Sequence, residues 1–225
     1  MKFLKIMLKL LSFCRELQRG FRVLRGIKHA VTILGSARLP EDHPACLDAM
    51  AVSQGLAESE NEYAIISGGG EFGIMRAANK GASIGGTPSV GCSIELLHEH
   101  RTNSFVDTDR EAKFKRFFLR KFIMFRATEA IIAFPGGYGT LDELFEALTL
   151  IQCQKQETPV KVILYDSNFW GGLVAWIKQT MYFKYKTISG EDLFLFSVVD
   201  TPEEAISIVC GNELPDVATA TLQAA

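Results

Sequence analysis

Short apolar runs alternate with longer amphipathic stretches along most of this chain, and this alternation limits the fold more than any other feature. The apolar runs lie at 30–34, 63–66, 89–94, 130–134 and 160–164. Stretches with helical spacing lie between several of them, at about 44–59, 73–84 and 140–154. Short buried strands that alternate with helices of this length predict βαβ units around one parallel sheet, which is an α/β fold.

The remaining segments are less regular. Residues 98–109 are polar, with a short strand expected near Phe105, and one long helix is expected from about Arg110 to Arg126. Two further helices are expected near 169–181 and 202–209, with a last strand between them at 195–199. We therefore divide the chain into an N-terminal helical extension (1–29), a single domain (30–214) and a flexible tail without periodicity (215–225).

The first 28 residues differ in charge from the rest, because they hold eight Lys or Arg residues and one acid, Glu16. Their apolar residues fit one face of a helix: Leu4, Met7, Leu8, Leu11, Cys14 and Leu17. Such a helix packs on its own domain or on a sister subunit, or it lies on an anionic membrane. We favour packing, because the domain that follows has the pattern of a soluble protein. No uncharged run of about 18 apolar residues occurs, so we expect no membrane span.

Charge and cysteine content exclude several classes of protein. The net charge is −2, which gives no general reason to expect nucleic-acid binding. The five cysteines are far apart and form no CxxC pair, so we expect neither a zinc site nor a disulfide framework, and a cytoplasmic compartment is the simpler interpretation. His98 and His100 lie close together in an expected loop, but no third ligand accompanies them, so we expect no metal.

Three of the expected strands end in turns of small residues, with the sequences GSAR (35–38), SGGGEFG (67–73) and PGGYGT (135–140). Glycine lets backbone N–H groups approach a ligand, and the following helix adds N–H donors and partial positive charge. Thr140 can donate its hydroxyl to the same anion. One such turn would be explained equally well as a tight connection. Three turns at one edge of a parallel sheet predict a phosphate site, although their spacing fits neither a Walker A loop nor GxGxxG.

A basic stretch, residues 110–126, precedes the third turn. A solvated helix surface explains most of its Lys and Arg residues. Arg120 differs, because its neighbours from Phe117 to Phe125 are mostly apolar, and a buried arginine needs an anionic partner. A phosphate or a carboxylate, held through two hydrogen bonds, would be such a partner.

Three acids, Asp142, Glu143 and Glu146, fall in the first turns of the helix that follows PGGYGT. The helix dipole stabilises acids at this position, which is a purely structural explanation. Glu143 also lies one turn from the expected phosphate, where a carboxylate can position water or stabilise a cationic sugar. The residues alone leave both interpretations open.

The stretch PGGYGTLDE (135–143) resembles the PGGxGTxxE signature of the LOG (lonely guy) family, whose members are often mislabelled as lysine decarboxylases. Arg120 and Lys121 resemble the second signature of that family. The resemblance extends from Gly35 to the strand at Val160 and more loosely to Val209, and residues 1–29 resemble an extension of longer bacterial-type members. It implies a Rossmann-like, doubly wound parallel sheet, and a homodimer or an assembly of dimers.

The characteristic activity of this family is hydrolysis of the N-glycosidic bond of a nucleoside 5′-monophosphate, either a cytokinin riboside monophosphate or AMP. We expect no cofactor, since no lysine suggests a pyridoxal phosphate site. By motif, the resemblance implies that Arg120 and Glu143 are the catalytic pair. A larger set is expected to bind the nucleotide, mainly its phosphate: Gly35, Ser36, Gly69, Gly70, Glu99, Lys121, Gly136, Gly137, Tyr138, Gly139, Thr140 and Thr149.

Three residues depart from the family's pattern: Glu71 where many relatives have proline, Arg76 where many have glutamate, and His100 where glutamine is usual. The charges of the first two could compensate one another. These changes bear on selectivity for the base more than on phosphate binding. An alternative function is non-catalytic binding of a nucleotide or a phosphorylated cofactor, and the retention of Arg120 and Glu143 favours the enzyme.

Overall fold

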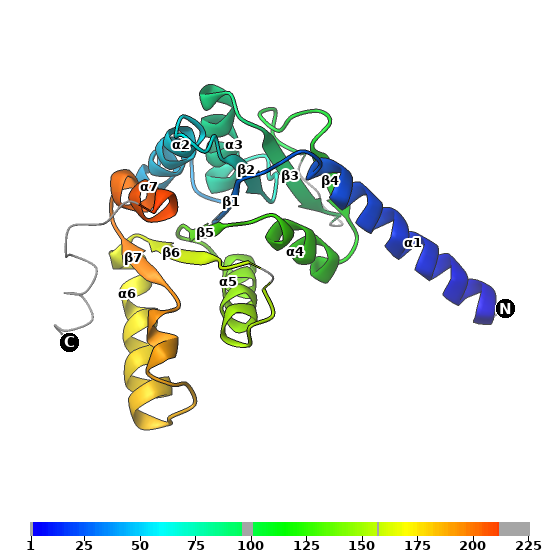
Figure 1. The fold of residues 1–225 in the computed structure, drawn as a ribbon. Helices are drawn as coiled ribbons and strands as arrows, with labels where there is room; N and C mark the ends of the chain where they lie inside the picture. The colour runs from blue at the N-terminus through cyan, green and yellow to red at the C-terminus, as the bar shows by residue number, and fades with distance from the viewer. Residues whose placement is uncertain (1, 96–100, 157, 212–225) are drawn as a thin grey trace.

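A computed structural model describes residues 2–95, 101–156 and 158–211 of the chain. Its centre is a sheet of seven parallel strands in the order β4-β3-β2-β1-β5-β6-β7 (Figure 1). The strands are β1 (Ala30–Leu34), β2 (Ala64–Ser67), β3 (Ser89–Ile94), β4 (Glu111–Phe114), β5 (Ala130–Ala133), β6 (Lys161–Tyr165) and β7 (Ser197–Val199). The prediction of a parallel α/β sheet is confirmed.

Helices connect most of these strands. The α-helices are α1 (Lys2–Val23), α2 (Pro44–Ala57), α3 (Gly73–Gly85), α4 (Phe117–Arg126), α5 (Tyr138–Gln152), α6 (Ser167–Trp176) and α7 (Pro202–Cys210). A π-helix, η1 (Ile177–Lys184), continues α6, and a 3₁₀-helix, η2 (Glu191–Phe194), precedes β7. The helix expected near 169–181 therefore begins earlier than predicted, because Asp166 accepts hydrogen bonds from the first N–H groups of α6.

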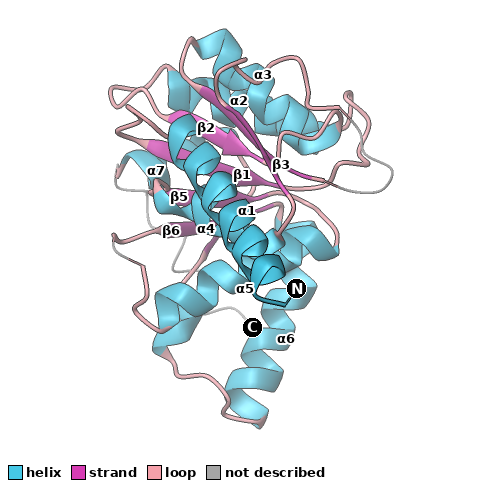
Figure 2. Ribbon diagram, turned by 90° about the vertical axis from the view of Figure 1, so that its right-hand side faces the viewer, coloured by secondary structure: helices cyan, strands magenta, loops and turns pink. Residues whose placement is uncertain are grey.

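Helices cover both faces of the sheet, because side chains alternate in direction along each strand. In β1, Val31 and Ile33 belong to one core cluster with α2, α3 and α7, whereas Ala30 and Leu34 belong to another with α4 and α5. Every residue of β1 is buried, as in strands that are covered on both sides. Figure 2 shows helices on either side of the strands. The doubly wound arrangement is thus confirmed.

The prediction of one long helix from Arg110 to Arg126 is wrong. Its first part forms β4, and α4 begins only at Phe117. The second and fourth residues of β4 are buried and the first and third are exposed, which is the two-residue period of a strand. Pairing with β3, a contact distant in sequence, decides this conformation. The strand expected near Phe105 is also wrong, since residues 101–109 form turns and irregular chain.

The C-terminal half of α1 holds this helix on the domain. Glu16, which is only 1% exposed, accepts a hydrogen bond from the guanidinium of Arg116, and that guanidinium also lies 4.0 Å from the centre of the Phe13 ring. The N-terminal half extends beyond the body of the molecule (Figure 1) and exposes its apolar side chains, among them Leu4 by 64% and Leu8 by 58%.

Of the apolar face that the sequence predicts to pack, from Leu4 to Leu17, only Leu17 packs against the core; the residues from Leu4 to Cys14 are exposed. In the part of the chain that the structure describes, no helix is long and apolar enough to cross a membrane. A sister subunit and an anionic membrane surface both stay predictions as the partner of this face. The expected tail, from residue 215, lies outside the described residues.

Candidate active site

The glycine-rich turns after β1 and β5 lie side by side, where the order of the strands reverses. Leu34 and Ala133 end these strands in register, and the N–H of Ser36 donates to the carbonyl of Pro135 at 3.0 Å. The carbonyl of Ser36 in turn accepts from the N–H of Ile74, in the first turn of α3 directly after the second glycine turn, at 2.9 Å. The three turns therefore meet at one edge of the sheet, which is the usual ligand position in doubly wound folds.

The backbone of Ser36 links the neighbouring segments, because its N–H is hydrogen-bonded to Pro135 and its carbonyl to Ile74. Gly35 is required by packing, because a Cβ there would lie 2.6 Å from the side chain of Ile74. The first turn thus holds the site together through the two residues that we expected to bind phosphate.

The third turn is built differently, and its glycines divide into two kinds. A Cβ on Gly136 would collide with the side chain of Thr140, so packing within the turn requires this glycine. A Cβ on Gly137 or Gly139 would meet no described atom within 4 Å, and the φ of Gly137 is an ordinary −94°. Neither strain nor internal packing explains these two glycines, whereas close approach of a ligand would.

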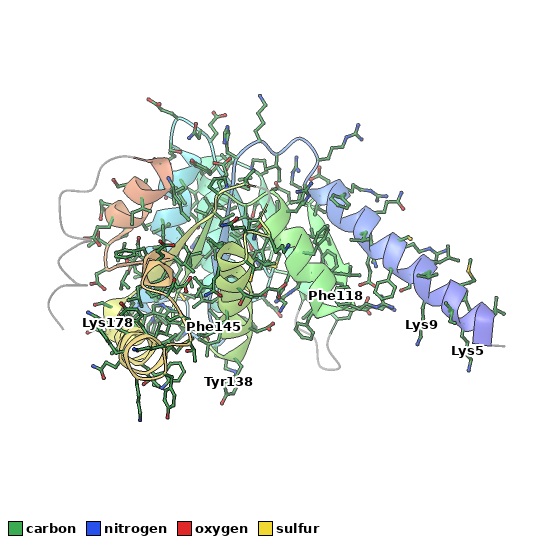
Figure 3. The ribbon with its side chains drawn as sticks, turned by 60° about the horizontal axis from the view of Figure 1, so that its bottom comes forward. Lys5, Lys9, Phe118, Tyr138, Phe145 and Lys178 are labelled. Atoms are coloured by element: carbon green, nitrogen blue, oxygen red, sulfur yellow. The ribbon has the colours of Figure 1, made fainter. Side chains whose placement is uncertain are left out.

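This turn leads directly into α5. Gly137 is the N-cap and provides no capping side chain, so the first N–H groups of the helix are left to an outside acceptor. Tyr138 is 92% exposed and extends away from the body of the molecule (Figure 3). The hydroxyl-bearing side chain of Thr140 is buried against Gly136. The geometry is that of an open anion site at the positive end of a helix.

A buried network of amide and hydroxyl groups holds the second turn. The N–H of Gly69 donates to Ser67 Oγ at 2.9 Å, so this predicted phosphate donor points into the protein. Asn79 Oδ1 accepts from Ser67 Oγ at 2.7 Å and from Asn103 Nδ2 at 2.9 Å, and the same Nδ2 donates to the carbonyl of Gly70 at 3.1 Å. Neither asparagine is among the site residues that we predicted from the sequence. Asn79 could have been noticed as an amide on the apolar side of α3.

Arg120 and Glu143 form an ion pair that joins α4 to α5. Nη2 of Arg120 donates to Oε1 of Glu143, and the two residues are only 9% and 6% exposed. Burial lowers the pKa of Arg120, but a guanidinium still remains charged at any ordinary pH. Burial also raises the pKa of the neighbouring Cys92 thiol to about 12, against the opposing charge of Arg120, so this thiol is neutral.

A cavity of about 210 Å³ opens beside this pair. The Gly68–Gly70 turn and Arg120 line it together with Arg101 and Thr102, and its apolar lining includes Phe72, Met75 and Ile94. A Cβ on Gly68 would lie 3.6 Å from Arg120 Nη1, so the guanidinium lies directly against the turn. Nε of Arg120 is buried and has no hydrogen-bond partner among the described residues. Arg120 thus connects Glu143 to the cavity.

Two residues of the expected nucleotide-binding set, Lys121 and Thr149, have partners within the protein. Nζ of Lys121 binds both carboxylate oxygens of Asp142 at 2.9 Å and also binds Glu146, so Lys121 clamps α4 to α5. Thr149 is exposed and donates its hydroxyl to the carbonyl of Phe145. It lies nine residues beyond Thr140, roughly 13 Å along the axis of α5 at about 1.5 Å per residue.

Glu99, and the histidine pair at 98 and 100, lie outside the described residues. Within the ranges 2–95, 101–156 and 158–211, no group of three or more His, Cys, Asp or Glu residues is arranged to hold a metal ion. The chemical groups that this site presents include backbone N–H donors, a hydroxyl, the buried Arg120 guanidinium and the buried Glu143 carboxylate.

Known proteins share this fold. The molybdenum cofactor binding protein of Rippkaea orientalis superposes with a TM-score of 0.58 at 20% identity, over 82% of this chain and 96% of that one. The molybdenum cofactor carrier protein of Chlamydomonas reinhardtii does so with a TM-score of 0.58 at 18% identity, over 82% of this chain and 97% of that one. At such identities the likeness concerns the fold alone.

Sequence comparison is more specific. A probable cytokinin riboside 5′-monophosphate phosphoribohydrolase of Arabidopsis thaliana is 30% identical over 118 residues, which span 52% of this chain and 57% of that relative. A cytokinin riboside 5′-monophosphate phosphoribohydrolase of Mycobacterium marinum is 28% identical over 164 residues, 73% of this chain and 85% of that protein. The model of the family described as "possible lysine decarboxylase" matches residues 75–209. The match includes α4 with Arg120 and the whole of PGGYGTLDE, and the chain therefore belongs to this family, the LOG family.

Proposed function

We propose that this protein hydrolyses the N-glycosidic bond of a nucleoside 5′-monophosphate and releases the free base and ribose 5-phosphate. The observation that carries the proposal is the buried pair of Arg120 and Glu143, which lies between an open helix N-terminus and a cavity. The names of the relatives favour a cytokinin riboside monophosphate as substrate, and the family resemblance adds AMP.

The phosphate of the substrate binds at the start of α5. Backbone N–H groups from Gly137 to Thr140 and the hydroxyl of Thr140 are its donors, and the dipole of α5 favours the negative charge. The absence of Cβ atoms on Gly137 and Gly139 lets the phosphate oxygens come close to these groups. Phosphate bound here fixes the ribose beside Glu143, one turn further along the helix.

Glu143 then acts on the anomeric carbon. As the C–N bond breaks, its electron pair leaves with the base, and the carboxylate stabilises the positive charge that develops on the sugar. A water molecule held by the same carboxylate adds its oxygen to the anomeric carbon, and its proton balances the departing base. Arg120 orients the carboxylate and contributes the wall of the cavity that receives the base.

Release of free base tests this proposal directly. The purified protein is incubated with AMP, GMP, CMP, UMP and isopentenyladenosine monophosphate, and the free base is measured by chromatography. We expect release from at least one adenine nucleotide and none from adenosine, which lacks the phosphate. Failure to release base from any of the five nucleotides would overturn the proposal.

The second candidate is non-catalytic binding of a nucleotide or a phosphorylated cofactor. The fold is shared with proteins described as binding or carrying the molybdenum cofactor, and the open N-terminus of α5 would suit any phosphate. Calorimetric titration of the same nucleotides separates the two functions. Binding without release of base favours the second candidate, and binding with release favours the first.

A further inference from the structure

The segment from Arg101 to Asp107, here called the pocket loop, forms one wall of the cavity beside Arg120. Its first two residues, Arg101 and Thr102, line the cavity. Its other end is fixed to the start of β3, because Asp107 Oδ2 accepts from the N–H of Ser89 at 3.0 Å and the N–H of Asp107 donates to the carbonyl of Ser89 at 3.0 Å. The loop therefore has an anchored end and an end at the cavity.

The middle of the pocket loop is tied to the second glycine turn. Asn103 is 4% exposed, and its N–H donates to the carbonyl of Gly69 at 3.0 Å while its side chain donates to Gly70 and Asn79. A Cβ on Gly69 would lie 3.3 Å from Thr102 Cγ2, which is a tight contact. Asn103 thus ties the loop to the turn, and because Arg101 and Thr102 also line the cavity, a displacement of this end of the loop changes the shape of the cavity.

Two charged side chains contact this loop at different points, Glu71 at its cavity end and Arg76 near its anchored end. Oε2 of Glu71 accepts from the N–H of Arg101 at 3.3 Å. The guanidinium of Arg76 lies 4.8 Å from the centre of the Phe105 ring and its Nε lies 2.7 Å from Oε1 of Glu41. Arg76 therefore finds its carboxylate in Glu41, and what Glu71 and Arg76 share is the pocket loop. They are also two of the positions that depart from the family's pattern.

We propose that Glu71 and Arg76 are positioning residues that set substrate selectivity through the pocket loop, so that the cavity accepts an unsubstituted purine in preference to one with a bulky apolar substituent. The cavity of about 210 Å³ is smaller than the range of about 300–1,000 Å³ that is usual for larger ligands. Its lining is mostly apolar and also holds the charged residues Glu71, Arg101 and Arg120, which suits a flat base with a polar edge. This inference rests on the proposed function, because it names the base that the same site accepts.

The test compares AMP with isopentenyladenosine monophosphate. The ratio of their kcat/KM values is measured for the wild type, Glu71→Ala, Arg76→Ala and the double variant. The wild type is expected to prefer AMP. Each single variant should shift the ratio about 3- to 10-fold toward the substituted nucleotide, the effect of losing one ordinary polar or cation–π contact. Because both contacts act on one loop, the double variant should shift the ratio by less than the product of the single shifts.

Glu60→Ala is the matched control, since Glu60 is an exposed acid outside the cavity lining, and it should leave the ratio unchanged. A wild type that prefers the isopentenyl nucleotide, or single variants with unaltered ratios, would overturn the inference. If the wild type releases no base, the ratio of the two dissociation constants replaces kcat/KM. Failure of catalysis with selective binding would then overturn the proposed reaction alone, and failure to bind either nucleotide would overturn both.

Discussion

Arg120 and Glu143 are paired across two helices, with both charges withdrawn from solvent and directly beside the glycine turn that ends β2. A buried ion pair is expensive to desolvate, and replacement by apolar residues often stabilises a protein. A contribution to the stability of the fold is therefore a poor explanation for this ion pair. Its position between the start of α5 and the cavity is better explained by chemistry on a bound ligand.

Glu143→Gln separates catalysis from binding. The amide keeps the shape of the side chain and an oxygen for Arg120, but it removes the charge that stabilises a cationic sugar. We expect base release to fall by about 10²- to 10⁴-fold, while the dissociation constant for AMP changes little, as measured by single-turnover assays and calorimetry. Glu146→Gln, on the same helix but paired with Lys121, is the control. Loss of AMP binding in Glu143→Gln would instead make this residue a ligand contact.

The glycines of the third turn should respond differently to alanine. Gly139→Ala adds a Cβ that meets no described atom, and alanine is more favourable than glycine in a helix by about 0.5–1 kcal/mol. We expect unchanged or slightly higher stability together with weaker AMP binding, because the new methyl occupies the path of the phosphate. Gly136→Ala should be destabilised by about 1–3 kcal/mol through overpacking against Thr140. Urea denaturation and calorimetry check both, and normal AMP affinity in Gly139→Ala would contradict the phosphate site.

The cysteines should differ in reactivity, because the thiolate is the reactive form. Burial raises the pKa of both Cys46 and Cys92, the latter to about 12, whereas Cys14 and Cys153 are exposed. Brief treatment with iodoacetamide at pH 7.5, followed by peptide mass spectrometry, should label Cys14 and Cys153 and spare the buried two until the protein is unfolded. Rapid labelling of Cys92 in the folded protein would contradict the packing beside Arg120.

The clamp made by Lys121 should weaken only at high pH. Burial alone lowers the pKa of Lys121, but hydrogen bonds and charges from Glu146 and Asp142 outweigh burial, so the pKa is raised. A cation with a raised pKa contributes its full stability below the unfolded pKa, about 10.4, and loses it as the pH rises through the folded value. As the pH rises above about 10.4, urea denaturation should show a larger loss of stability for the wild type than for Lys121→Arg, which stays charged. Equal losses would argue against the clamp.

Local sequence patterns predicted those features of the fold and the site that are determined by residues close together in the sequence. Strands such as Ala30–Leu34 are apolar throughout because both faces are covered, and that composition is visible in the sequence. An arginine among phenylalanines needs an anionic partner wherever it is buried, which is why Arg120 could be singled out. The motif resemblance then supplied Glu143 as its companion.

Other features depended on contacts that are distant in sequence. Residues 111–114 are a strand because β3 presents a free edge to them, although their neighbours favour a helix. Lys121 was expected at the phosphate, but the orientation of α4 against α5 directs it to Asp142 and Glu146 instead. Asn79 and Asn103 meet only because the chain returns to the second turn.

The parallel α/β class and the three glycine turns could be predicted from the sequence, because each follows from residue type and spacing within a short segment, whereas the pairing of Arg120 with Glu143 came from the motif resemblance. The tertiary structure decided which turns hold one another and which one is open to a ligand. The backbone N–H and carbonyl of Ser36 are hydrogen-bonded to Pro135 and Ile74, so they are not free to bind a ligand. The N-terminus of α5, by contrast, has no capping side chain. Backbone hydrogen-bond partners at a sheet edge are set by strand order, and strand order is a property of the whole fold.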